Sequence, residues 1–195
     1  MVSVGYRAYR GYGRVRDKVA SLMVRGAFES FGAHSVLAHP VRLSGVEHIR
    51  IGSGVYIGAS SWLQVIDDPS STGKRSEVVI DIADDVRMSG MCVISGATEI
   101  RIEKGALLAR NVYVADHGHA FADGDKAIHE QGIDSIAPVR IGAGAWLGQN
   151  VVLLPGADVG RQSIVGANSV VRGVIPDRAI AVGAPARVVR TIDDA

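Results

Sequence analysis

Residues 141–171 read IGAGAW LGQNVV LLPGAD VGRQSI VGANSV V, and they set the architecture of the chain. An apolar residue returns at every sixth position: Ile141, Leu147, Leu153, Val159, Val165 and Val171. A helix repeats every 3.6 residues and an amphipathic strand every two, so neither puts a six-residue rhythm on one face. A period of six is typical of a parallel β-helix, in which each hexad forms one short flat side and a turn.

The same rhythm extends towards the N-terminus with two interruptions. It begins near Ile51, breaks at the polar run 67–75, resumes at Ile82 and breaks again between Asp116 and Ala137. Three hexads make one triangular coil of 18 residues, so we expect an all-β solenoid of roughly five stacked coils. Insertions in solenoids project on one face and often bind ligands, so the two interruptions are expected to carry function.

The expected organisation has three parts. An N-terminal arm and capping helix occupy 1–45, the β-helix occupies 46–175 with loops at 67–79 and 116–138, and a short C-terminal tail or helix occupies 176–195. Residues 1–13 contain three glycines and predict a loose arm, whereas apolar residues at helical spacing predict a short amphipathic helix from Arg14 to about Phe31. Its basic side fits peripheral contact with an anionic membrane, but we favour a cap over the open end of the solenoid.

Composition narrows the class of protein. Only 5% of the 195 residues are aromatic and 24 are glycine, which fits a narrow aliphatic interior. A net charge of +1 gives no reason to expect a nucleic-acid partner. The single cysteine, Cys92, excludes an internal disulfide and predicts a buried, inert thiol in a reducing compartment. No signal-peptide core or membrane-length apolar run is visible, so a cytoplasmic protein is expected.

The second interruption carries the candidate chemistry. It opens with Asp116-His117-Gly118-His119 and also contains His129. A histidine at the foot of a loop suits the removal of a proton from a hydroxyl near neutral pH. A His-x-His pair also suits a metal ion, with His129 as a third ligand. The residues alone leave both interpretations open.

Several segments together resemble the hexapeptide-repeat acyltransferases, nearest to the maltose, galactoside and polysaccharide O-acetyltransferases. They are 115–119 (ADHGH), 138–148 (PVRIGAGAWLG), 165–171 (VGANSVV) and 182–190 (VGAPARVVR), and the likeness extends from about Val46 to Ile192. The resemblance implies a left-handed parallel β-helix and a homotrimer with active sites between subunits. It also implies acetyl-coenzyme A as donor, a sugar or polysaccharide-precursor hydroxyl as acceptor, and no metal.

In that family one histidine, five residues after a ladder residue, acts as general base. Counting from Val114 gives His119, which we assign as the base; relatives with a single Asp-His pair favour His117 instead. With His119 as base, His117 or Asp116 is expected to orient the site or contact the acceptor. Phe121, in the same loop, is a further candidate for acceptor contact.

The resemblance also implies contacts to coenzyme A. A guanidinium suits a phosphate, and the coil backbone suits the amides of the pantetheine arm. The expected contacts are Gly148, Gln149, Gly166 and Ala167 for the pantetheine arm, Trp146 for the thioester end, and Arg172, Arg187 and Arg190 for the phosphates. For Trp146, simple packing on the outside of a coil is an equal alternative. Backbone amides between Gly142 and Gly148 are candidates for the oxyanion hole.

Three alternatives stay open at this point. N-acetylation of an amino sugar would use the same base. An enzyme like the γ-type carbonic anhydrases, on the same fold, would use His117, His119 and His129 as metal ligands. A non-catalytic scaffold of the same coils would need no histidine loop at all.

Overall fold

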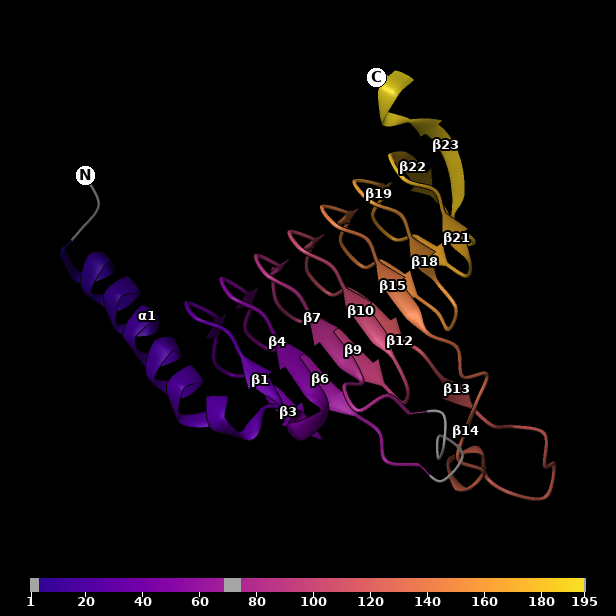
Figure 1. Ribbon diagram of the computed structural model, residues 1–195, viewed down its shortest axis with the longest axis horizontal. Helices are drawn as coiled ribbons and strands as arrows, with labels where there is room; N and C mark the ends of the chain where they lie inside the picture. Colours follow the sequence, from indigo (N-terminus) through magenta and orange to yellow (C-terminus); the bar gives the residue numbers. More distant parts are fainter. Residues whose placement is uncertain (1–3, 69–74, 195) are drawn as a thin grey trace.

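The computed structural model describes residues 4–68 and 75–194. After helix α1 (Val4–Val24), the chain winds into a three-sided solenoid, and each coil adds one strand to each of three sheets (Figure 1). The first sheet contains β1 (Ser30–Phe31), β4 (Ile49–Ile51), β7 (Ile80–Ile82), β10 (Ile100–Ile102), β15 (Val139–Ile141), β18 (Asp158–Val159) and β21 (Val174–Ile175). The second contains β2 (Val36–Leu37), β5 (Tyr56–Ile57), β8 (Arg87–Met88), β11 (Leu107–Leu108), β16 (Trp146–Leu147), β19 (Ile164–Val165), β22 (Ala179–Val182) and β23 (Arg187–Thr191). The third contains β3 (Arg42–Ser44), β6 (Trp62–Val65), β9 (Val93–Gly96), β12 (Tyr113–Ala115), β17 (Val152–Leu153) and β20 (Val170–Val171).

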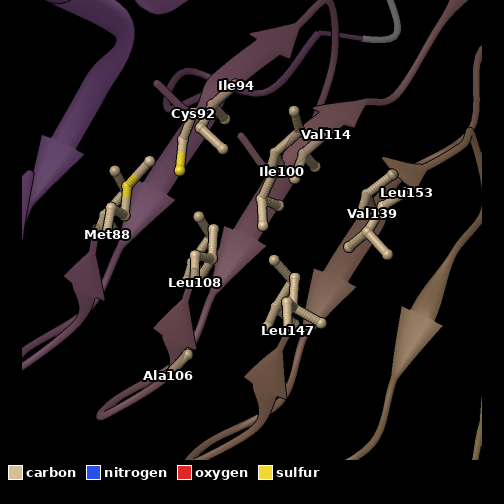
Figure 2. Packing of buried hydrophobic residues seen from close by; sticks show 14 of the residues in the cluster. Met88, Cys92, Ile94, Ile100, Ala106, Leu108, Val114, Val139, Leu147 and Leu153 are labelled. Carbon is tan, nitrogen blue, oxygen red and sulfur yellow. The ribbon is translucent and has the colours of Figure 1, made fainter. Parts of the chain in front are cut away.

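The six-residue rhythm places one apolar side chain of each strand inside the solenoid. Leu108 pairs in parallel register with Met88 on one side and with Leu147 on the other, and all three are fully buried. Figure 2 shows these side chains in line, one coil above the next. The backbone joins the coils, as in the 2.9 Å hydrogen bond from Trp146 N–H to the Ser163 carbonyl. The predicted parallel solenoid is therefore confirmed, and its parallel sheets are consistent with the implied left-handed β-helix.

The corners of the solenoid explain the glycines and asparagines of the repeat. A Cβ on Gly142 would lie 2.6 Å from the backbone nitrogen of Arg161 in the next coil, so this turn stacks only without a side chain. At another corner, Asn111, Asn150 and Asn168 all adopt a positive φ near 60°, which asparagine tolerates better than most residues. Their amides form a ladder, with hydrogen bonds of 3.0 and 2.9 Å.

The solenoid begins earlier than expected and runs longer. Its first coil starts at Ser30 rather than at 46, and the described residues form six complete coils and part of a seventh rather than five. Phe31, Leu37 and Leu43 already keep the spacing of six, but no glycine follows Leu37 or Leu43 to mark the repeat.

The two ends of the chain also differ from expectation. Residues 4–13 belong to α1 and are not a loose arm, and the helix ends at Val24 instead of near Phe31. At the other end, β22 still pairs in parallel with β19, and β23 then returns antiparallel to cover the last strand edge. The C-terminal segment is thus mostly strand, followed by one short 3-10 turn, η5 (Ile192–Asp194).

Only the second half of α1 docks on the first coil, so the predicted cap is partial. The Ser21 hydroxyl accepts a 2.9 Å hydrogen bond from the Leu37 N–H, and the Asp17 carboxylate accepts one of 3.1 Å from His39 N–H. Figure 1 shows the first half of the helix extending away from the coils. Within the described chain, no helix has the length and apolarity needed to cross a bilayer.

Both loops leave the solenoid at the same corner, where the third sheet ends. The first lies between β6 and β7 and the second between β12 and β15, and β6, β9 and β12 are neighbours in the sheet. The first loop includes 69–74, which lie outside the described residues. In the second loop, β13 (Gly118–His119) pairs antiparallel with β14 (Ile133–Asp134) beyond the turn η4 (Ile128–Glu130). An ideal Cβ on Gly132 would lie 3.2 Å from a carboxylate oxygen of Asp68, so the loops lie side by side.

Cys92 is buried in the core, as predicted, and its thiol contacts the Ala109 carbonyl at 3.3 Å. Burial raises the pKa of this thiol, which keeps it protonated and unreactive.

The inward register can be tested with two adjacent leucines. Leu108→Ala removes a fully buried side chain between two coils, so we expect a loss of about 2–5 kcal/mol in the free energy of unfolding. Leu107→Ala, on the outside of the same strand, is the matched control and should cost only about 0.5 kcal/mol. Urea unfolding followed by circular dichroism measures both. Equal losses in the two variants would contradict the register.

Candidate active site

Asp116 is the anchor of the candidate site, at the corner where β12 ends. Its side chain is fully buried, and its two oxygens accept hydrogen bonds from three consecutive backbone N–H groups. The distances are 2.7 Å to Ala97, 2.7 Å to Thr98 and 2.8 Å to Glu99. The Thr98 hydroxyl adds a bond of 3.1 Å. The carboxylate therefore fastens the turn after β9 to the start of the second loop.

This environment keeps Asp116 ionised. Burial raises the pKa of the carboxyl, but the hydrogen bonds from His117, Thr98, Ala97 and Glu99 together outweigh it and hold the pKa below its usual value. A buried negative charge with this many donors is fixed in position before any substrate arrives.

His117 is held by that carboxylate. Its Nδ1 lies 2.9 Å from Asp116 Oδ1, and only 7% of its side chain is exposed. Because Asp116 is ionised, Nδ1 carries the proton, and Nε2 is left with a lone pair. Ser95 Oγ lies 3.5 Å from Nε2 and accepts a 2.7 Å hydrogen bond from the Gln64 amide. Because Ser95 Oγ accepts from Gln64, its own O–H is free to donate a hydrogen bond.

The solenoid register brings these residues together from three coils. Gln64 pairs with Ser95, and Ser95 pairs with Ala115, which lies two residues before His117. Gln64 and Ser95 were not expected at the site from the sequence. A signal was present, because each follows a ladder residue (Leu63 and Ile94) by one position, but the loop between them hides the alignment.

His119, the base expected from the sequence, lies in a different environment. It is on β13 in the second loop, its side chain is exposed, and among the described residues no group forms a hydrogen bond with its ring. Phe121 is 70% exposed in the same loop, where an acceptor can reach it. Asp116 is fully buried and has no free surface for an acceptor, so of its two expected roles only orientation fits.

The described structure does not bring together the three histidines of the metal alternative. His129 is exposed in η4, and in the described part of the chain no three histidine, cysteine or acidic side chains are close enough to hold a metal ion together.

The expected pantetheine contacts lie on another edge of the solenoid. Trp146 is half exposed on the second sheet, and Gly148 and Gln149 form the corner between the second and third sheets. Gly166 and Ala167 form the same corner one coil further on. His117 lies at the far end of the third sheet, so one chain does not bring it to these residues. Gly148 also has a packing role, because a Cβ there would lie 2.6 Å from the Ala167 nitrogen.

Two of the three arginines expected to bind the phosphates lie at one cavity. Arg172 and Arg187 line a cavity of about 410 Å³ at the C-terminal end, together with Val174 and Pro185. Arg190 is exposed on β23 beyond it. Arg172 follows β20, which lies two strands from β12 in the third sheet, so this cavity is about 10 Å along the solenoid axis from the His117 corner.

The backbone amides expected to form the oxyanion hole already donate hydrogen bonds within the chain. The backbone N–H groups of residues 142–146 and 148 all form hydrogen bonds within the chain, mostly to carbonyls of neighbouring coils. The prediction of an oxyanion hole from these amides is therefore wrong for this conformation.

Comparison with known proteins identifies the family. The bacterial transferase hexapeptide family (six repeats) matches residues 138–173. A putative acetyltransferase of Staphylococcus aureus is 31% identical over 65% of this chain and 74% of its own length. The chain belongs to the hexapeptide-repeat acetyltransferase family.

Further relatives are longer than the matched region. A probable acetyltransferase of Mycobacterium tuberculosis is 36% identical over 73% of this chain and 49% of its own length. The putative lipopolysaccharide biosynthesis O-acetyl transferase WbbJ of Escherichia coli is 35% identical over 57% of this chain and 60% of its own. The chain therefore matches only about half to three-fifths of these two hexapeptide proteins.

Solved structures agree on the fold. AntD, an N-acyltransferase from Bacillus cereus in complex with dTDP and 3-hydroxybutyryl-CoA, has a TM-score of 0.72 at 18% identity, covering 88% of this chain and 87% of that one. A galactoside acetyltransferase in complex with coenzyme A has a TM-score of 0.59 at 26% identity, covering 89% of this chain and 70% of that one.

The charge on Asp116 should make stability depend on pH. Asp116→Asn keeps the shape but loses the charge that the four donors and His117 require, so we expect it to be less stable at neutral pH. The pKa of Asp116 is lowered in the folded state, so its contribution is present above the unfolded value of about 3.9 and is lost as the pH falls through the folded value. Thermal unfolding of both proteins from about pH 7 to about pH 3 should show the gap closing in acid. A gap that stays constant would show that the carboxylate charge is not its source.

Proposed function

We propose that this protein is an acetyl-coenzyme A-dependent O-acetyltransferase that modifies a hydroxyl of a sugar or polysaccharide precursor. The observation that carries the proposal is the buried Asp116–His117 pair, with His117 Nε2 available as a base at the foot of two adjoining loops. The named activity of the O-acetyl transferase relative supports an oxygen acceptor. The coenzyme A bound to the galactoside enzyme supports the donor.

The proposed base is His117, in place of His119. A general base needs a fixed tautomer and a lone pair directed at the proton it removes. Asp116 supplies the first by holding Nδ1–H, which leaves the lone pair on Nε2. The exposed His119 has neither constraint and is left as a candidate acceptor contact beside Phe121.

The reaction is direct transfer. The acceptor hydroxyl donates to His117 Nε2 and gives up its proton as its oxygen attacks the thioester carbonyl. The imidazolium that forms is stabilised by the Asp116 carboxylate. The tetrahedral intermediate then expels the coenzyme A thiolate, which takes the proton from His117 Nε2. The base ends in its starting state, and the acetyl group is now an ester of the acceptor.

The donor is proposed to bind between subunits of a left-handed homotrimer. Trp146, Gly148 and Gln149 lie across the third sheet from His117, so a neighbouring subunit has to bring a pantetheine-binding edge to the base. Gly166 and Ala167 continue that edge. Arg172, Arg187 and Arg190 are proposed to hold the phosphates at the C-terminal cavity. The reducing cytoplasm, where acetyl-coenzyme A is available, is the proposed location.

Two histidine variants test the proposed base. His117→Ala should lower kcat by about 10²–10⁴-fold with acetyl-coenzyme A and a responsive acceptor. His119→Ala, two residues away in the same loop, is the matched control and should keep most of its turnover. Release of the coenzyme A thiol, measured across a panel of sugars, amino sugars and nucleotide sugars, follows both. An inactive His119→Ala with an active His117→Ala would restore His119 as the base. Turnover only with amino sugars would favour N-acetylation.

A donor without phosphates tests whether Arg172 and Arg187 bind the phosphates of coenzyme A. Arg172→Gln and Arg187→Gln should each raise KM for acetyl-coenzyme A by about tenfold, because each loses a charge-assisted hydrogen bond to a phosphate. Acetyl-pantetheine lacks the phosphates, so its KM should not change in either variant. If KM rises equally for both donors, these arginines act on the shape of the site and not on the phosphates.

A further inference from the structure

Helix α1, together with Arg25 directly after it, has an excess of positive charge. Residues 4–25 contain six arginines and lysines and one aspartate, a net charge of +5. The whole chain has a net charge of only +1, so everything outside this helix is net negative. The acetyl-transfer proposal uses none of these helical charges.

The same helix exposes an apolar stripe. Asp17, Ser21 and Val24 lie on the side of α1 that packs on the first coil. The side chains on the opposite side follow helical spacing and are between 50% and 81% exposed: Tyr12, Val15, Val19, Leu22 and Met23. We call these five residues the apolar stripe. Their exposure follows from the docking geometry, since the hydrogen bonds of Asp17 and Ser21 fix which side faces the solenoid.

A basic cavity lies beside the apolar stripe. It has a volume of about 520 Å³ between α1 and the first coil, and Lys18, Arg25 and His34 line it together with Leu22 and Phe31. Lys18 and Arg25 form no ion pair with any acidic side chain in the described part of the chain. The cavity therefore offers cationic groups next to apolar walls, which is the chemistry of a phospholipid phosphate and its acyl chain.

We propose that α1 docks the protein on an anionic phospholipid membrane. The helix lies in the plane of the interface, with the apolar stripe inserted among the acyl chains. Lys18 and Arg25 contact headgroup phosphates from the basic cavity. A second copy of the chain is a poorer occupant, because two helices of net charge +5 would be brought together.

The placement of α1 suits this role. It lies at the N-terminal end of the solenoid (Figure 1). The cavity lined by Arg172 and Arg187 involves residues 171–175 and 185–187, at the C-terminal end. A membrane held by α1 leaves the proposed donor site open to water. Membrane binding and acetyl transfer can thus be measured separately, and failure of one does not imply failure of the other.

Vesicle binding by the full chain tests the proposal. It should sediment with vesicles of phosphatidylcholine mixed with phosphatidylglycerol, but not with phosphatidylcholine alone, and added salt should release it. Val19→Gln combined with Leu22→Gln should abolish sedimentation without unfolding the protein, because both side chains are exposed. A tryptophan introduced by Met23→Trp should shift its emission to the blue only when anionic vesicles are added.

Charge-matched variants complete the design. Lys18→Gln with Arg25→Gln should weaken binding at least tenfold, whereas Arg87→Gln with Arg161→Gln removes the same charge from the solenoid and should not. Equal weakening by both pairs, or equal binding to neutral vesicles, would overturn the proposal. The proposal would also be overturned if the wild-type protein bound no vesicle. If, in addition, the Val19→Gln and Leu22→Gln variant had a different oligomeric state from the wild type, the apolar stripe would be assigned to contact with a second copy of the chain.

Discussion

Backbone pairing between successive coils is the constraint on which the rest of this structure depends. Each short strand satisfies its N–H and carbonyl groups only through the coils above and below it, at a spacing near 4.8 Å. That spacing admits one apolar side chain per strand inside and little more than hydrogen at stacked turns such as Gly142. The chain can insert residues only where a strand ends, because an insertion within a strand would break pairs on both sides.

The candidate site follows directly from this constraint. Two insertions leave the solenoid at the end of the third sheet, two strands apart, and the coil between them contributes Ser95 and the turn 97–99. The Asp116 carboxylate closes that turn from the next coil. The residue that orients His117 is therefore also a structural clamp between coils, so we expect its substitution to change stability and the proposed proton transfer together.

The sequence predicts the periodic part of the molecule well and its exceptions poorly. The spacing from Ile141 to Val171 gives the solenoid, the buried ladder and the position of both loops, because one repeat rule applies to every coil. The first coil was missed because a glycine follows only Phe31, and none follows Leu37 or Leu43 to mark the other two corners. The N-terminal helix was shortened because glycines and tyrosines in 5–13 weaken its helical pattern, although the structure keeps them helical.

The choice between His117 and His119 shows where reading the sequence reaches its limit. Both follow the same strand, and a count along the chain cannot tell which ring turns towards the coils. The difference is made by Asp116, whose charge is drawn inward by amides of residues 97–99, and the adjacent ring follows it. Those amides come from a coil separated in sequence by about one turn of the solenoid. The orientation of His117 therefore depends on how neighbouring coils pair, and not on the spacing of residues along the chain.

The separation of scaffold residues from loop residues has a consequence for acceptor specificity. The proposed base and its carboxylate are fixed by the scaffold, since all the donors to Asp116 come from His117 and the coil turn at 97–99. The proposed acceptor surface, by contrast, consists of loop residues such as the exposed Phe121, which lies outside the stacked coils. Changes in the loops can therefore alter the acceptor while leaving the proton-transfer pair intact. In the proposed mechanism, a carboxylate that is ionised and a ring that is oriented before the acceptor binds need little reorganisation during the reaction, which is the condition under which buried electrostatic stabilisation is most effective.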